Sequence, residues 1–269
     1  MTATVSSQSF DASIAQLTDL QNLRVWSIIV SLFGDLAQKP GDQISGTTLT
    51  QIITPMGIKP EAIRVALHRL RKDGWINSTR SGRASVHYLT EFGRNQSAAV
   101  TPRIYARAPQ PPQSWHLLIA EDGSGQTTLE ETLLLPQYTQ VNRRTALGYG
   151  TAPDGLDDLL VATVCELSVP NWLQTRLFPQ DLVAACQALL DALSKIPPPS
   201  AEALTPVQIA TLRTLIVHHW RRIALRHPVL PAGFPPADWA GEACRARVFD
   251  LLDRLPQPQL SALIGKALT

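Results

Sequence analysis

Residues 58–90 read IKPEAIRVALHRLRKDGWINSTRSGRASVHYLT and give the strongest structural signal in the chain. Pro60 suits the first position of a helix, where a backbone N–H would have no partner in any case. Gly74 predicts the end of that helix, because glycine adopts left-handed geometry without strain. Between them, apolar side chains recur at spacings of three and four, which predicts a helix with one buried face: Ile63, Ala66, Leu67 and Leu70.

The residues after this helix predict two strands joined by a basic turn. Trp75 opens the first strand, Arg80 and Arg83 flank the turn, and residues 85–89 alternate as a second strand does. A helix followed by such a hairpin is typical of a winged helix-turn-helix, whose helix enters the DNA major groove while its wing reaches phosphates or the minor groove. The alternative is an ordinary solvent-facing amphipathic helix and hairpin.

Basic and hydroxyl side chains of this region are the candidate DNA contacts. Arg64 and His68 are expected to meet base edges, and Arg71 and Lys72 to meet phosphates, although all four could touch phosphate alone. Arg69 lies off this face and is expected to form an ion pair. The other candidates are Lys59 before the helix, Thr47 and Thr48 (which could equally be helix caps), and Arg80, Arg83 and His87 on the wing, of which His87 could be ordinary surface.

Charge is concentrated in this part of the chain. Residues 58–107 contain ten Lys and Arg against three Asp and Glu, a net charge of +7, whereas the 269-residue chain carries +2 and its remainder therefore −5. A basic segment on a mildly acidic body predicts a polyanionic partner, such as double-stranded DNA, at one end of the molecule.

Composition shifts suggest three domains, and hence an α+β protein. Residues 1–18 are expected to be a flexible tail. Residues 19–100 should form the winged helix-turn-helix domain, with helices over 19–38, about 45–54 and 60–73 and a further helix capped by Thr90. A proline-rich linker, 101–113, ends this domain.

The rest of the chain predicts two further domains. Strand candidates at 115–120, 141–149 and 159–167, with helix candidates at 127–135 and 171–178, favour a small ferredoxin-like α+β domain over residues 114–178. Residues 179–269 should form a helical domain, since long helical patterns there are separated by proline runs.

Several protein classes are disfavoured. The three cysteines, Cys165, Cys186 and Cys244, have no metal-ligand spacing and are expected to be buried free thiols. There is no pattern of a signal peptide and no apolar run of membrane-spanning length, so we expect a cytoplasmic protein without a membrane partner. His218 and His219 are adjacent on a helix and point about 100° apart, so they should pack in the core and not hold a metal.

Three blocks of the chain resemble the PaaX-like family of bacterial transcriptional repressors. They are AIRVALHRLRKDGWI with RSGRASVHYLTEFG, then RIYARAP followed by Trp115, and finally HHWRRIALRHPVLPAGFPPADWAGEACRARVFDLL. The resemblance implies a winged-helix domain, a ferredoxin-like domain of the CRISPR Cas2 type and a helical domain. It also implies a homodimeric repressor of an aromatic-acid catabolic operon that binds a palindromic operator, with the DNA contacts on residues 59–72 and 80–87.

The resemblance further implies a small effector, such as phenylacetyl-coenzyme A or another acyl-CoA, although a regulator without a CoA-ester ligand stays open. No other cofactor is expected. Arginines that could grip the phosphates of such a ligand, and tryptophans that could stack on its acyl group, occur near the C-terminus. These candidates are Trp220, Arg221, Arg222, Arg226 and Trp239.

A non-enzyme is expected. The alternative is a metal-dependent nuclease of the Cas2-like type, in which Asp122, Asp157 and Asp158 would bind magnesium. The chain contains no P-loop, dinucleotide fingerprint or nucleophile elbow.

Overall fold

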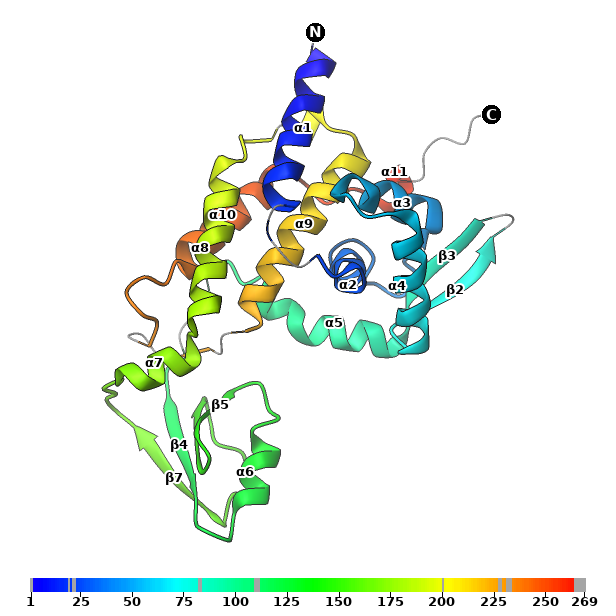
Figure 1. Ribbon diagram of the computed structural model, residues 1–269. Coiled ribbons are helices and arrows are strands. Elements are labelled where there is room, and N and C mark those ends of the chain that lie inside the picture. Colours follow the sequence, from blue (N-terminus) through cyan, green and yellow to red (C-terminus); the bar gives the residue numbers. More distant parts are fainter. Residues whose placement is uncertain are drawn as a thin grey trace. The chain divides into compact units, whose positions relative to one another are not determined.

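The protein is described from a computed structural model, which covers residues 2–18, 20, 23–81, 84–108, 112–199, 201–226, 229–230 and 234–263. Its fold is mixed α+β, and the chain divides into two compact units (Figure 1). Unit 1 comprises residues 1–107, 184–225 and 240–269, and unit 2 comprises residues 108–183 and 226–239.

Unit 1 is mainly helical, with one small sheet of order β1-β3-β2. Its elements up to the first crossing into unit 2 are α1 (Thr2–Thr18), α2 (Val25–Leu36), β1 (Ile44–Ser45), α3 (Gly46–Ile53), η1 (Thr54–Met56), α4 (Pro60–Lys72), β2 (Ile76–Ser81), β3 (Ala84–Leu89) and α5 (Glu91–Ile104). Its later elements are α8 (Gln180–Lys195, of which the first residues belong to unit 2), η2 (Ala201–Ala203), α9 (Pro206–Ala224), α10 (Gly241–Arg254) and α11 (Leu260–Leu263).

The helix α9 is the central element of unit 1, and its residues explain this position. Thr205 and Gln208 form a capping box at its start. Apolar side chains cover most of its circumference, as expected of a helix buried on all sides. It contacts α1, α2, α3, α5, α10 and α11. The predicted separate helical domain at 179–269 therefore differs from the structure, because α9 fills the core on which the N-terminal helices pack.

A buried ion pair joins three parts of unit 1. The Arg213 guanidinium on α9 donates to both carboxylate oxygens of Asp35 on α2, at 2.8 and 2.9 Å. The Tyr105 hydroxyl, just after α5, donates to Asp35 at 2.7 Å, and a third Arg213 nitrogen donates to the Leu255 carbonyl at 2.5 Å. Burial and the neighbouring carboxylate raise the pKa of Tyr105, which keeps its hydroxyl a donor.

The first residues of the chain differ from the expected flexible tail. Residues 2–18 form α1, and Phe10, Ile14 and Leu17 are buried. The Leu17 carbonyl accepts a hydrogen bond from His219 on α9 at 2.9 Å. The helical signal around Ile14 is weak in the sequence, because the stability of this helix comes largely from packing on other elements such as α9.

Unit 2 contains a four-stranded antiparallel sheet of order β5-β6-β4-β7. Its elements are β4 (Trp115–Ala120), α6 (Gln126–Thr132), β5 (Tyr138–Asn142), β6 (Thr145–Tyr149), β7 (Leu159–Val164) and α7 (Asn171–Leu177). The segment predicted as one strand over 141–149 is the end of β5, a turn and β6, because Arg143 and Arg144 lie in the turn.

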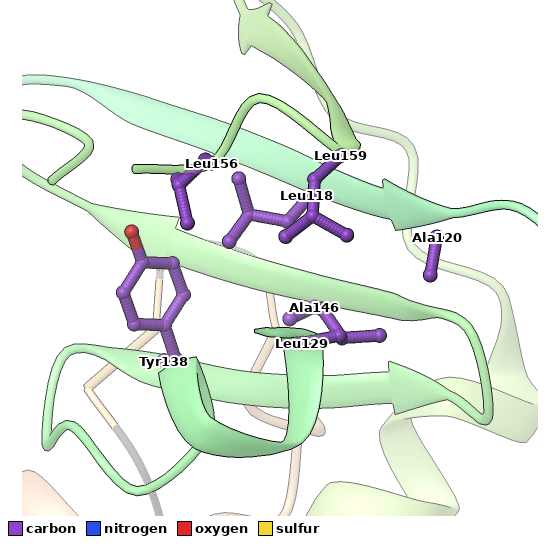
Figure 2. Packing of buried hydrophobic residues seen from close by; sticks show 7 residues of the cluster. All are labelled: Leu118, Ala120, Leu129, Tyr138, Ala146, Leu156 and Leu159. Carbon is purple, nitrogen blue, oxygen red and sulfur yellow. The ribbon is translucent and has the colours of Figure 1, made fainter. Parts of the chain in front are cut away.

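One face of this sheet packs against α6. Figure 2 shows Leu118 from β4, Ala146 from β6 and Tyr138 from β5 gathered with Leu129 of α6 (Figure 2). The opposite face is covered in part by Leu173, Phe178 and other apolar side chains of unit 2. The described residues 150–158, between β6 and β7, contain no helix, which differs from the β-α-β-β-α-β order of a ferredoxin-like domain.

Cysteine placement was predicted only in part. Cys186 and Cys244 are buried free thiols, as expected, but Cys165 is exposed, just past the end of β7.

Candidate nucleic-acid interface

The helix α4 is held so that one face is buried and the other is open to solvent. Ser45 caps α3, and η1 leads through Gly57 to Pro60, the first residue of α4. The predicted apolar stripe is buried: Ile63, Ala66, Leu67 and Leu70. These residues pack α4 against α2, α3 and β2, and the hairpin β2–β3 lies beside it (Figure 1). The helix and the hairpin therefore present neighbouring surfaces.

The outer face of α4 carries the predicted basic side chains. Lys59, Arg64, His68, Arg71 and Lys72 are all exposed. Arg64 pairs with Glu61 at 2.7 Å, but both side chains are about 70% exposed, at 73% and 69%. Such a solvent-facing pair is worth little and exchanges readily for another anion, so Arg64 stays available to a partner.

Val65 is a candidate contact that the sequence analysis missed. It is 69% exposed on α4, next to Arg64, whereas Val30, Val217 and Val248 of unit 1 are buried. The sequence could have indicated this exposure, because Val65 lies outside the apolar stripe of this helix. An exposed aliphatic side chain on a basic helix face is suited to contact the C5-methyl group of thymine.

The predicted DNA contacts of the hairpin differ in their exposure to solvent. Arg80 is exposed near the end of β2. Arg83 lies outside the described residues. His87 was a candidate DNA contact or ordinary surface residue, but it is only 4% exposed and lies between Ser78 and Ser85, whose hydroxyls are 2.7 and 3.2 Å from its ring nitrogens. Burial, with a smaller effect of the Arg71 charge, lowers the pKa of His87, so its role is to support the hairpin.

Thr47 and Thr48 also differ in exposure. Thr47 is exposed at the start of α3, as a phosphate contact requires. Thr48 is buried: its N–H donates to the capping Ser45 hydroxyl at 3.0 Å, and its own hydroxyl lies 3.4 Å from the Leu263 carbonyl. Thr48 is thus engaged with Ser45, the cap of α3, and its side chain is buried.

Arg69 behaves as expected of a residue off the basic face. It lies 3.5 Å from Asp73, one turn further along α4, and its guanidinium lies 5.8 Å from the ring centroid of Trp26. Its charge is thus partly offset within unit 1.

The predicted effector residues are divided between the units. Trp220, Arg221 and Arg222 belong to unit 1, and Arg226 and Trp239 to unit 2. Trp220 is a core residue whose indole N–H donates to the Ile104 carbonyl at 2.8 Å. Arg226 pairs with Asp181 at 2.8 Å, and Trp239 packs edge-on against Phe178. Arg221 lines a small crevice between α2, α5 and α9.

Two of the three carboxylates considered for a nuclease, Asp122 and Asp158, have other partners. Asp122 pairs with Arg144 at 2.6 Å, and Asp158 accepts a hydrogen bond from Thr128 at 2.8 Å. Within the described part of the chain, no three His, Cys, Asp or Glu side chains are grouped as metal ligands. Nor is any described helix long and apolar enough to cross a membrane.

Two family models match the chain. The model described as PaaX-like protein covers residues 24–93, which hold α2 to the start of α5, and the model described as PaaX-like protein C-terminal domain covers residues 180–260. The chain belongs to the PaaX-like family. Both matches fall mainly on unit 1, so the family pattern includes α4, its supporting helices and α9.

Two individual proteins are similar over most of the chain. The transcriptional repressor PaaX of Escherichia coli K12 is 26% identical over 275 residues, which cover 90% of this chain and 84% of that protein. Among solved structures, the uncharacterized protein Rv0674 from Mycobacterium tuberculosis has a TM-score of 0.51 at 19% identity and covers 87% of this chain and 96% of its own. The second match concerns the fold alone.

Proposed function

We propose that this protein is a transcriptional repressor that binds double-stranded DNA through α4 and the β2–β3 hairpin, acting in the cytoplasm on a catabolic operon of the aromatic-acid (phenylacetate) type. The observation that carries the proposal is the exposed basic face of α4 on a helix whose other face is buried. The name of the Escherichia coli relative supports regulation and not an enzyme.

In this proposal the two units have separate fold assignments. The α3–η1–α4 segment and the hairpin form a winged helix-turn-helix, with α4 as the recognition helix. Unit 2 is a shortened ferredoxin-like domain of the Cas2 type, which keeps one crossover helix, α6, and replaces the other with the loop between β6 and β7.

A palindromic operator requires two copies of the chain related by a twofold axis. The edge strand β7 suits such an interface. It pairs only with β4 among the described strands, its sequence LLVATV has no charge, and Leu160 and Val161 are 62% and 42% exposed. An unprotected apolar edge of this kind pairs readily with another strand. We therefore propose a homodimer in which two β7 strands pair antiparallel.

Release from DNA would follow binding of a small effector, for which an aryl-CoA ester is the first candidate. The effector must bind the DNA-incompetent state more tightly than the DNA-binding state, since otherwise it could not shift the equilibrium. No described residue is assigned to a CoA moiety.

The function is tested by enriching bound DNA from random double-stranded oligonucleotides. We expect a consensus with twofold symmetry and no cleavage of the retained DNA in the presence of magnesium. Retention of unrelated sequences with equal strength would contradict sequence-specific repression, and cleavage would instead support the nuclease alternative.

A further inference from the structure

The helix α4 carries one acidic side chain on its otherwise basic outer face. That residue is Glu61, the only Asp or Glu in the sequence of α4, and its side chain is 69% exposed. A carboxylate on a surface that binds a duplex is repelled by the nearby phosphates. Glu61 therefore weakens DNA binding unless it makes a favourable contact of its own with the duplex.

The position of Glu61 places it among the candidate base contacts. Residues three, four and seven positions apart share one face of an α-helix, and counted from Glu61 these residues are Arg64, Val65 and His68. All four side chains are exposed. Glu61 lies in the first turn of α4, and the N-terminal residues of a recognition helix are the ones that reach base edges. The same face that presents Arg64 to the duplex thus presents Glu61.

A second role for an acid at this position is stabilisation of the helix. A carboxylate in the first turn interacts favourably with the partial positive charge at the helix N-terminus. Glu91 has the corresponding place in α5, because it is also acidic, exposed and in the first turn. It lies outside α4, so it offers a matched control that separates helix stabilisation from DNA recognition.

A carboxylate discriminates among bases by the groups that they present in the major groove. It only accepts hydrogen bonds, and cytosine offers the N4 amino group with no acceptor beside it. Guanine and thymine present acceptors, and adenine presents the N7 acceptor next to its N6 amino group. Cytosine is therefore the base that matches Glu61.

The ion pair with Arg64 indicates where this cytosine lies. The Arg64 guanidinium is 2.7 Å from the Glu61 carboxylate, so the two groups are no further apart than one base-pair step, whose rise is about 3.4 Å. Side chains about three residues apart on a helix in the major groove can contact successive bases, as in zinc fingers. Arginine most often donates to O6 and N7 of guanine. A cytosine beside a guanine thus satisfies both side chains.

We propose that Glu61 is a specificity-determining residue, which accepts a hydrogen bond from the N4 amino group of a cytosine while Arg64 donates to a guanine of the adjacent base pair. This inference rests on the proposed function, because it requires α4 to lie in the major groove. Opening the exposed pair of Glu61 and Arg64 costs little in water. Each side chain then exchanges its partner on the helix for one on the DNA.

The base assignment is tested by enriching bound DNA from random duplexes with the unaltered full chain and with Glu61→Gln. The unaltered protein should select cytosine at one position in each half-site. Glu61→Gln should shift this preference toward adenine, because an amide accepts from N6 and donates to N7 of adenine, and should leave the other positions unchanged. Helix stabilisation alone changes no base preference, so a consensus identical for both proteins would overturn the inference.

Affinities for two duplexes separate base contact from repulsion. Glu61→Ala should bind the enriched duplex about tenfold more weakly, since it loses one base contact, and should bind a scrambled duplex at least as tightly as the unaltered protein, since it loses a negative charge. Glu91→Ala should leave the ratio of the two affinities unchanged. A Glu61→Ala protein that binds both duplexes more tightly to the same degree would show repulsion alone and contradict the inference.

Arg64→Ala separates a base contact by Glu61 from positioning of Arg64. We expect this variant to lose the guanine preference and to keep the neighbouring cytosine preference, which Glu61→Ala should lose. Loss of the same single position in both variants would mean that Glu61 only orients Arg64. An unaltered protein that retains all duplexes equally would refute the proposed function as well, whereas a consensus that neither Glu61 variant changes would refute this inference alone.

Discussion

At the scale of single residues, His218 and His219 make the free energy of unfolding depend on pH. Both are buried on α9; His218 lies 3.3 Å from the Ser31 hydroxyl, and His219 contacts the Leu17 carbonyl. Burial lowers the pKa of His218 to about 3 and that of His219 to about 4. Because the unfolded chain binds these protons near pH 6.5, stability is full above that pH and falls as the pH drops toward the folded values.

Between pH 7.5 and pH 5 we therefore expect each of the two histidines to cost on the order of 2 kcal/mol of unfolding free energy. Urea titrations at both pH values measure this loss. His219→Gln, which can keep a donor near Leu17, should reduce the pH dependence. A free energy of unfolding that stays constant down to pH 5 would show that these side chains are not held neutral by the fold.

Val65 gives a second prediction at this scale. If it contacts a thymine methyl group, replacing that thymine by uracil should weaken binding by about 1 kcal/mol. Val65→Ala should bind the thymine and uracil duplexes equally and unfold at nearly the same urea concentration as the unaltered protein, because the side chain is exposed. Fluorescence anisotropy with both duplexes decides it. An unaltered protein that is insensitive to every single uracil replacement would remove Val65 from base recognition.

The sequence predicted which side chains of α4 are exposed, but it did not predict which side chains of the hairpin are exposed. Helical spacing alone separates Arg64 and Arg71 from the apolar stripe, and the structure exposes both. The alternation of β3 also places His87 on one face of the strand. Its burial, however, depends on β1, a strand distant in sequence whose Ile44 pairs with His87. A two-residue strand has no sequence pattern from which that pairing could be predicted.

At the scale of elements, the edge of β7 makes a testable interface. Leu160→Glu should shift a dimer toward monomer, because charge on an edge strand opposes strand pairing. Leu134→Glu is the matched control, since Leu134 is 84% exposed just past α6, in the same unit. Analytical ultracentrifugation of the three proteins measures the change. A Leu160→Glu protein that sediments as the unaltered dimer would place the interface elsewhere.

The helix α4 was predicted to within a residue or two, whereas α2, expected over 19–38, spans only Val25–Leu36. The helix α4 has a proline start, a regular stripe and a glycine stop, and Gly74 has the positive φ of 74° that such a stop uses. The helix α5, whose cap Thr90 was predicted, continues to Ile104, past Pro102 and past the predicted end of the domain at residue 100. Ile104 is buried and its carbonyl accepts from Trp220, so a contact distant in sequence extends this helix beyond its local signal.

At the scale of the whole molecule, the pair of Asp35 and Arg213 explains why unit 1 gathers both ends of the sequence. Local patterns predicted three consecutive domains, since proline runs look like boundaries. Local sequence patterns contain no information on the pairing of Asp35 with Arg213, which lie 178 positions apart. Removing one partner of a buried ion pair leaves a buried charge, so Asp35→Ala should lower the free energy of unfolding by about 3–5 kcal/mol.

The exposed pair of Arg107 and Asp253 is the matched control for this prediction. Its side chains are 61% and 55% exposed, so Asp253→Ala should change the free energy of unfolding far less. Urea denaturation of both variants, followed by circular dichroism, gives the comparison. Equal losses in the two variants would mean that the Asp35–Arg213 pair does not hold unit 1 together.

The central claim, that the outer face of α4 and the hairpin bind a sugar-phosphate duplex, is tested most directly by the salt dependence of DNA affinity. For four to eight phosphate contacts, log K against log salt concentration should be linear with a slope on the order of −4 to −7, and Lys72→Ala should reduce the slope by about one. A slope near zero, or one that simultaneous alanine substitution of Lys59, Arg71, Lys72 and Arg80 leaves unchanged, would contradict the account.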